Sequence, residues 1–227
     1  FYIHSVYVWD RELTNTEMKI VTRAIRKEIG GVPDLSPTAT SAVVPIRDLR
    51  AYYMRFLLAM RPAQSINIFA DLEASTVRNR VGAGFEAIVT GSEATLVPYT
   101  GLSNGAANEL IALRGTNTTK LLWPENSVPV GATICSVSRY TGVENGRIFN
   151  GYGSPSQSAN WLHGHWSNKR GMSYYAGDGF ASQNSISVGM LTDWLVMCGI
   201  SGGSSPGNVA IDQQSVGITR SIYATSV

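Results

Sequence analysis

The chain has 227 residues, of which 44% are hydrophobic, and this length suits one large β domain or a domain and a half. Only 15% of the residues are charged and the net charge is +2, so no strong field draws the chain to nucleic acid or an anionic membrane. No apolar run approaches the ~20 residues of a membrane-spanning helix, and the abundant Gly, Ser, Thr and Asn are typical of extracellular and structural β proteins.

The first predicted unit, residues 1–31, is a strand followed by a helix. The stretch YIHSVYVWD, residues 2–10, is rich in β-branched and aromatic residues, which favours a strand. Thr14 and Glu17 form a capping-box pattern at the start of a helix, and Gly30-Gly31 ends it. Apolar residues at helical spacing make one stripe along this helix: Met18, Val21, Ile25 and Ile29.

Residues 32–64 are the predicted linker with a short helix. The stretch VPDLSPTATSAVVPIRD, residues 32–48, is rich in Pro, Ser and Thr and shows no sustained period. The following stretch LRAYYMRFLLAM, residues 49–60, fits either a short amphipathic helix or a buried strand, and we favour the helix.

Residues 65–227 are predicted to form the main β domain. Short β-prone runs alternate with turn signals such as Asn104-Gly105, Asn145-Gly146 and Asn150-Gly151. Parallel strands would need crossover helices that the sequence does not offer. The pattern therefore predicts a mainly β fold, an antiparallel sandwich or jelly roll.

Three segments resemble a laminin-G-like, concanavalin-A-like β-sandwich repeat. The stretch VPVGATICSVSRYTGVENGRIFNG is similar to a strand–loop–strand near the middle of such domains. The stretch LTDWLVMCGISGGSSPGNVAIDQQSVGI resembles the next signature, and HSVYVWDRELTNTEMKIV resembles the closing strand and helix. Similar repeats occur in structural proteins of marine algae and their large viruses. The resemblance implies a sandwich fold in a setting such as an extracellular fibre, a surface coat or the diatom pyrenoid shell.

The order of these segments is unusual, because the closing strand and helix come first here. We therefore expect residues 1–31 to be a permuted element, or one from a preceding repeat, that completes a sandwich by strand addition. The acceptor could be the same chain or a neighbour, and we favour a neighbour. Because the chain starts at Phe1 without an initiator Met, we read it as a piece of something longer. The residues expected to make the assembly contact are Tyr2, Ile3, Val6, Val8, Trp9, Met18, Val21, Ile25 and Ile29.

Two cysteines, Cys135 and Cys198, stand in strand-like runs and are too few for a disulfide framework. The sequence leaves open whether they pair, but the resemblance implies that their strands share one sheet, so we expect them near each other. Asn117 begins an Asn-Thr-Thr sequon for N-glycosylation, which matters only if the chain is secreted.

The stretch NWLHGHW, residues 160–166, is compatible with a metal site, a sugar platform or a packed strand. His163 and His165 are two residues apart, so on a strand both imidazoles could reach one ion. A cupin-type site needs further His or Glu ligands, and only His4 remains. We therefore predict no bound transition metal and no cofactor.

The same region offers a carbohydrate surface as the alternative. Aromatic faces stack on pyranose rings, and polar side chains orient the hydroxyl groups. In the packed-strand interpretation, Leu162, Gly164 and Trp166 face inward while the other side chains share the opposite face. The candidate glycan-binding residues are Trp161, His163, His165, Trp166, Asn168, Arg170, Tyr174 and Tyr175.

No catalytic residues are predicted. Laminarinase-type sandwiches carry E-x-D-x-x-E on one strand, as a two-carboxylate mechanism requires, and the chain has no such run. It also has no G-x-S-x-G, CxxC or Walker motif. The sequence leaves calcium binding open, because Asp178, Asp193 and Asp212 could offer oxygen ligands but do not cluster in the sequence.

The sequence thus predicts a non-catalytic structural β-sandwich module that associates with itself or with adjacent repeats through strand and helix exchange. The alternative is a carbohydrate-binding, lectin-like module of the same fold. We expect an extracellular or surface structure, or an organelle-associated protein shell, and neither nucleic acid nor membrane as a partner.

Overall fold

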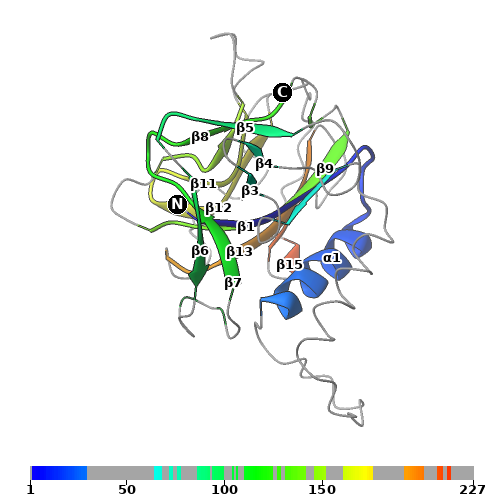
Figure 1. Cartoon of the computed structure of the whole chain (residues 1–227). Coiled ribbons are helices and arrows are strands. Elements are labelled where there is room, and N and C mark those ends of the chain that lie inside the picture. Colours follow the sequence, from blue (N-terminus) through cyan, green and yellow to red (C-terminus); the bar gives the residue numbers. More distant parts are fainter. Residues whose placement is uncertain are drawn as a thin grey trace.

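The structure of the chain is a computed structural model. It describes residues 2–29, 64–67, 72–73, 76–77, 86–92, 94–99, 104, 106, 110–124, 127–128, 131–141, 146–151, 161–175, 192–201, 209–211 and 214–215. The predicted linker and the helix favoured at residues 49–60 lie outside these ranges, apart from residue 64. The described part contains the helix α1 (Asn15–Glu28) and strands that form three sheets (Figure 1).

Every strand pair in the described part is antiparallel, which confirms the prediction of a mainly β, antiparallel fold. Within the described residues the main sheet has eight strands: β1 (Tyr2–Trp9), β2 (Gln64–Asn67), β6 (Thr95–Tyr99), β7 (Leu110–Arg114), β9 (Ala132–Arg139), β13 (Leu195–Ser201), β14 (Val209–Ile211) and β15 (Gln214–Ser215). A four-stranded sheet contains β3 (Leu72–Glu73), β4 (Thr76–Val77), β5 (Ala87–Thr90) and β8 (Lys120–Leu122). A three-stranded sheet contains β10 (Phe149–Asn150), β11 (Trp161–Trp166) and β12 (Lys169–Tyr175).

The first strand of the chain lies in the middle of the main sheet (Figure 1). The strand order is β15-β14-β13-β9-β1-β7-β6, and β2 pairs with β1 on the same edge as β7. The other edge of β1 pairs with β9 along its whole length, from Tyr2 opposite Arg139 to Trp9 opposite Thr133. In this structure the strand therefore pairs within its own chain, whereas a neighbouring chain was the favoured acceptor in our expectation.

A β-bulge at His4 decides which side chains of β1 face each side of the sheet. The pairing with β9 shifts register between Ile3 and Ser5. A bulge adds one residue to its strand, so the side chains before it point to the opposite face from the one that strict alternation would give. Ile3 therefore shares a face with Val6 and Val8, and Tyr2 packs on the other face.

The start of α1 forms the capping box that the sequence predicts. The backbone N–H of Glu17 donates to Thr14 Oγ1 at 3.2 Å, and the backbone N–H of Thr14 donates to Glu17 Oε2 at 2.8 Å. Arg11 adds a salt bridge to the same carboxylate at 2.9 Å. These contacts account for a helix that begins at Asn15, one residue after the cap.

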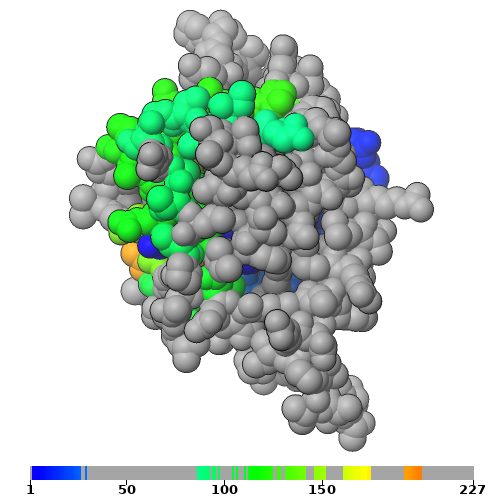
Figure 2. All heavy atoms as spheres, viewed as in Figure 1, coloured from blue at the N-terminus to red at the C-terminus, as the bar shows by residue number. Residues whose placement is uncertain are grey.

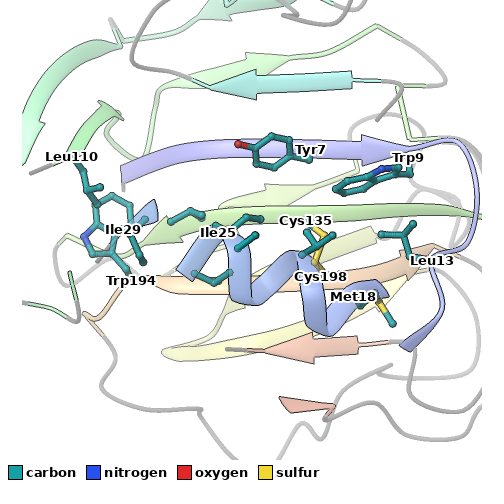
Figure 3. Packing of buried hydrophobic residues seen from close by; sticks show 14 of the residues in the cluster. Tyr7, Trp9, Leu13, Met18, Ile25, Ile29, Leu110, Cys135, Trp194 and Cys198 are labelled. Carbon is teal, nitrogen blue, oxygen red and sulfur yellow. A yellow bond between two sulfur atoms is a disulfide. The ribbon is translucent and has the colours of Figure 1, made fainter. Parts of the chain in front are cut away.

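The apolar stripe of α1 covers one face of the main sheet (Figure 3). Met18, Val21, Ile25 and Ile29 are all fully buried, as the helical spacing predicts. They pack against aromatic and aliphatic side chains of the sheet, which are Tyr7, Trp9, Cys135, Val137, Trp194, Val196, Cys198 and Ile200.

Cys135 and Cys198 lie directly opposite each other on β9 and β13 and form a disulfide on this α1-covered face (Figure 3). The prediction that they lie near each other in one sheet is confirmed. Their pairing, which the sequence left open, follows from the register of two adjacent strands.

The opposite face of the main sheet packs against the two smaller sheets. The shared core cluster contains Ile3, Val6, Val8, Ala87, Leu113, Ala132, Ile134, Phe149, Trp161, Leu195 and Met197. The central strands are thus buried on both faces, so YIHSVYVW and ATICSVSR show no clean alternation of apolar and polar residues. On the side drawn in Figure 2, little of the N-terminal segment, coloured blue, reaches the surface.

Candidate functional site

The two histidines that the sequence singled out face β9 from β11. His163 Nε2 lies 3.1 Å from Ser136 Oγ, and His165 Nδ1 lies 3.4 Å from Ser138 Oγ. All four side chains are fully buried. Because side chains two apart on a strand share a face, the two contacts form successive rungs, which we call the serine–histidine ladder.

Gly164 lies between the two histidines on β11, opposite a β-bulge whose extra residue is Gly171 of β12. The register between β11 and β12 shifts between Gly164 and His165, and Gly164 has a φ of +94°. An added Cβ would meet Leu195 Cδ2 at 3.6 Å and Ser138 Oγ at 3.8 Å, which are ordinary contacts. The backbone conformation, more than the available space, therefore favours glycine here.

Burial holds both imidazoles in the neutral form near neutral pH. Desolvation lowers the pKa of His163 to about 3, opposed by a hydrogen bond with the Met197 backbone. Desolvation also lowers the pKa of His165, and the positive charge of Arg170 lowers it further. Arg170 lies opposite His165 on β12. A neutral imidazole can share a hydrogen bond with a hydroxyl group without placing a charge in the core.

Aromatic rings enclose the ladder. The Tyr140 ring lies edge-on to His165 with centroids 4.7 Å apart. The rings of Phe149 and Trp161 lie 6.1 Å and 6.2 Å from that of His163. In this conformation the serine hydroxyl groups are closed off from solvent, so the ladder acts as a buried polar contact between two sheets.

Two buried arginines connect the strands around the ladder, and one of them, Arg139, contacts the beginning of β1. Arg170 Nη2 donates a hydrogen bond to the Trp194 carbonyl at 2.8 Å. Arg139 Nη1 donates to Asn104 Oδ1 at 2.9 Å. The Arg139 guanidinium also lies over the rings of Tyr2, at 5.4 Å, and Trp194, at 5.8 Å. A cation over two aromatic faces stabilises the position of Tyr2 at the start of β1.

Within the described residues, no group of three or more His, Cys, Asp or Glu side chains comes together to hold a metal ion. Asp193 is half-buried just before β13, and the other two aspartates considered for calcium, Asp178 and Asp212, lie outside the described ranges.

The structure corrects the expectation of an exposed sugar platform on β11. Trp161, His163, His165 and Arg170 are buried, because β11 and β12 pack over the main sheet. Trp166, which the packed-strand interpretation placed inward, is instead partly exposed. Asn168 is exposed, Tyr174 is half-buried, and the Tyr175 side chain lies outside the description. Glycan binding through other residues stays a prediction.

The residues predicted for assembly come together in β1 and α1. Tyr2 is half-buried and stacks on Trp194, with ring centroids 6.2 Å apart. The others are buried: Ile3, Val6, Val8, Trp9, Met18, Val21, Ile25 and Ile29. Ser136 and Ser138 were not among the predicted site residues, although two serines alternating with Cys135 and Val137 indicate a strand with two different faces.

Comparisons with family models, with curated proteins and with solved structures found no match to this chain. The laminin-G-like resemblance therefore rests on the sequence motifs alone. Among the described residues, no helix has the length and apolar character needed to cross a membrane.

Proposed function

We propose that the chain is a structural β-sandwich module that assembles with copies of itself, or with adjacent repeats, by exchanging the segment β1–α1. In this proposal the main sheet is one layer of a concanavalin-like sandwich and the smaller sheets belong to the other. One observation carries the proposal: the first strand of the chain is a central strand of the main sheet, with hydrogen-bonded neighbours on both edges.

The position of β1–α1 in the sequence favours exchange. Residues 30–63, more than thirty in number, connect α1 to β2. An extended chain spans ~3.3–3.6 Å per residue, so a connection of this length can reach roughly 100 Å. A neighbouring copy offers the same acceptor edges, so the contacts that β1 makes within its chain can be made between chains without loss.

The apolar content of the segment explains why each module needs one copy of it. Burying each large side chain of the α1 stripe contributes roughly 1.5–3 kcal/mol in transfer free energy, as an upper estimate. An acceptor without the segment would expose the matching face of the sheet and the edges of β9, β7 and β2. Exposed edges and apolar faces promote pairing with another chain.

Deletion of residues 1–30 tests the need for the segment. We expect the shortened chain to lose its cooperative unfolding transition and its ability to assemble. A synthetic peptide of residues 1–30, added in trans, should restore both. A deleted chain that stays folded with the oligomeric state of the full chain would contradict the proposal.

A cross-linking experiment distinguishes exchange from closure within one chain. Tyr2 lies opposite Arg114 in the pairing of β1 with β7, so Tyr2→Cys and Arg114→Cys place two thiols in register. We expect the double variant to form a disulfide within one chain, and a mixture of the two single variants, unfolded and refolded together, to form one between chains. Lys120→Cys is the matched control for Arg114→Cys, because Lys120 is also exposed but pairs with Thr90 in another sheet.

Three outcomes of this experiment are informative. Cross-links between Tyr2→Cys and Arg114→Cys chains, without cross-links to Lys120→Cys chains, support exchange. Cross-links in the double variant alone show that the register is right and that exchange is wrong. Equal cross-linking to both partners indicates random collision and also contradicts exchange.

A further inference from the structure

The sequon at Asn117 lies in an exposed turn between two sheets. The turn follows β7 in the main sheet and precedes β8 in the four-stranded sheet. Thr116, Asn117 and Thr118 are exposed, while Gly115 and Thr119 at the ends of the turn are buried. Asn117 is therefore presented at the surface between two well-anchored strands.

Threonine side chains hold this turn in place. The backbone N–H of Thr116 donates to Thr119 Oγ1 at 3.0 Å, and the backbone N–H of Thr118 donates to Thr116 Oγ1 at 3.3 Å. The hydroxyl groups of Thr118 and Ser92 also share a hydrogen bond. These three contacts join Thr116, Thr118, Thr119 and Ser92, so a group added to the exposed Asn117 side chain leaves them in place.

The buried disulfide points independently to the compartment in which such a modification occurs. Cys135 and Cys198 are fully buried and joined, and structural disulfides form and persist in oxidising compartments such as the endoplasmic reticulum lumen. The same lumen contains the enzyme that transfers lipid-linked oligosaccharides to sequons. A disulfide in the core and a sequon on an exposed turn thus fit one route of synthesis.

We propose that Asn117 is an acceptor for N-linked glycosylation. The co-reactant is an oligosaccharide linked through pyrophosphate to a lipid. A bond forms between Asn117 Nδ2 and C1 of the first sugar, the bond between C1 and the pyrophosphate oxygen breaks, Nδ2 loses a proton, and lipid pyrophosphate leaves. Electrons and atoms balance without an oxidant or reductant. The inference does not depend on strand exchange.

The test is expression of the full chain behind a secretory leader in a eukaryotic cell line, collecting both secreted and lumenal protein. We expect a single glycosylated site. The electrophoretic shift that it causes should disappear after treatment with peptide N-glycosidase. That treatment should convert Asn117 to Asp, detected by peptide mass. Asn117→Gln should abolish the shift while leaving the thermal unfolding of the deglycosylated protein unchanged.

Two further variants separate the acceptor from the structure of the turn. Thr118→Ala removes a hydroxyl contact of the turn but keeps an Asn-x-Thr sequon, so the glycan should remain. Thr119→Ala should abolish it, whereas Thr119→Ser, which keeps the hydroxyl group, should retain it. Unmodified Asn117 in wild-type protein that carries the Cys135–Cys198 disulfide would overturn the proposal.

Discussion

At the scale of single residues, the serine–histidine ladder determines how β11 lies over the main sheet. Buried polar groups are stable in a core only when they are hydrogen-bonded, so Ser136 and Ser138 favour the register that places an imidazole next to each. Shifting β11 by one residue would move both histidines to the other face. The ladder therefore stabilises one alignment of the two sheets, whereas apolar contacts alone would tolerate several.

The ladder predicts a loss of stability in mild acid. Both histidines have folded-state pKa values below the usual 6.5, so below pH 6.5 the unfolded chain binds protons that the folded chain does not, down to about pH 3 in the case of His163. Their contribution is complete above about pH 6.5 and falls by up to about 1.4 kcal/mol per pH unit for each imidazole. Urea unfolding at about pH 7.5 and about pH 5 measures the difference.

The double variant His163→Gln and His165→Gln should show a much flatter pH dependence over the same range. Glu17 titrates in a separate window, because its hydrogen bonds with Arg11 and Thr14 lower its pKa to about 2. Its contribution is present above about pH 4.5 and is lost as the pH falls through 2. An unchanged slope between pH 6.5 and 5 in the double variant would show that other groups are responsible.

Gly164 is the residue whose backbone conformation we expect to matter most for β11. Its φ of +94° lies where side chains with a Cβ are disfavoured, so Gly164→Ala should lower the free energy of unfolding by about 1–2 kcal/mol. Gly146→Ala is the control. No atom lies within 4 Å of the Cβ that it adds, so it should change the free energy of unfolding little. Denaturant unfolding measures the free energy of unfolding of both variants. Equal losses would show that the backbone conformation of Gly164 does not disfavour a Cβ.

At the scale of elements, local signals were sufficient for α1 but not for every strand. The capping box predicts the beginning of the helix, Gly30-Gly31 predicts its end, and the apolar stripe predicts its buried face. By contrast, the sequence gives no clear strand signal for β6, because Pro98 interrupts an otherwise suitable run. Pro lacks the N–H that a strand donates, and β6 tolerates it because, among the strands that the structure describes, it is the last on its side of the main sheet.

The cap of α1 can be tested by removing its hydroxyl group. Thr14→Ala removes the acceptor for the Glu17 N–H, so we expect the free energy of unfolding to fall by about 1 kcal/mol. Thr16→Ala is the matched control. Thr16 is the exposed second residue of α1, so this change should have little effect or a slightly stabilising one. Thermal unfolding followed by circular dichroism compares them, and equal losses would argue against the cap.

At the scale of the whole molecule, the main sheet holds the fold together because elements from distant parts of the chain meet in it. Its four adjacent strands β7, β1, β9 and β13 come from residues 110–114, 2–9, 132–139 and 195–201, in that order. The disulfide connects β9 to β13 across 63 residues of sequence, under the helix that follows β1. Long-range closure of this kind restricts the unfolded chain more than a local cross-link does.

Removing the disulfide should therefore cost substantial stability. We expect the double variant Cys135→Ala and Cys198→Ala to lose about 2–4 kcal/mol in the free energy of unfolding, measured in urea. Because both sulfur atoms are buried, a thiol reductant should act slowly on the native chain and quickly once denaturant opens it. Equal rates of reduction in native and denaturing conditions would show that α1 does not cover the bond.

The sequence by itself determined the features that depend on near neighbours in the chain. These are the helix behind its capping box, the β character of the central strands, and the antiparallel arrangement implied by short runs and tight turns. Each depends on interactions within a few residues, so its signal survives without knowledge of the fold.

Only the tertiary structure decided which chemistry those elements carry. Two histidines on one face of a strand are compatible with a metal site, a sugar platform or a packed core, and the choice depends on what covers that face. In the structure β9 covers it and supplies Ser136 and Ser138 from a distant part of the sequence. The disulfide and the bulge at His4 likewise depend on the register between neighbouring strands. Burial and register are properties of pairs of segments, and a pattern along one segment does not contain them.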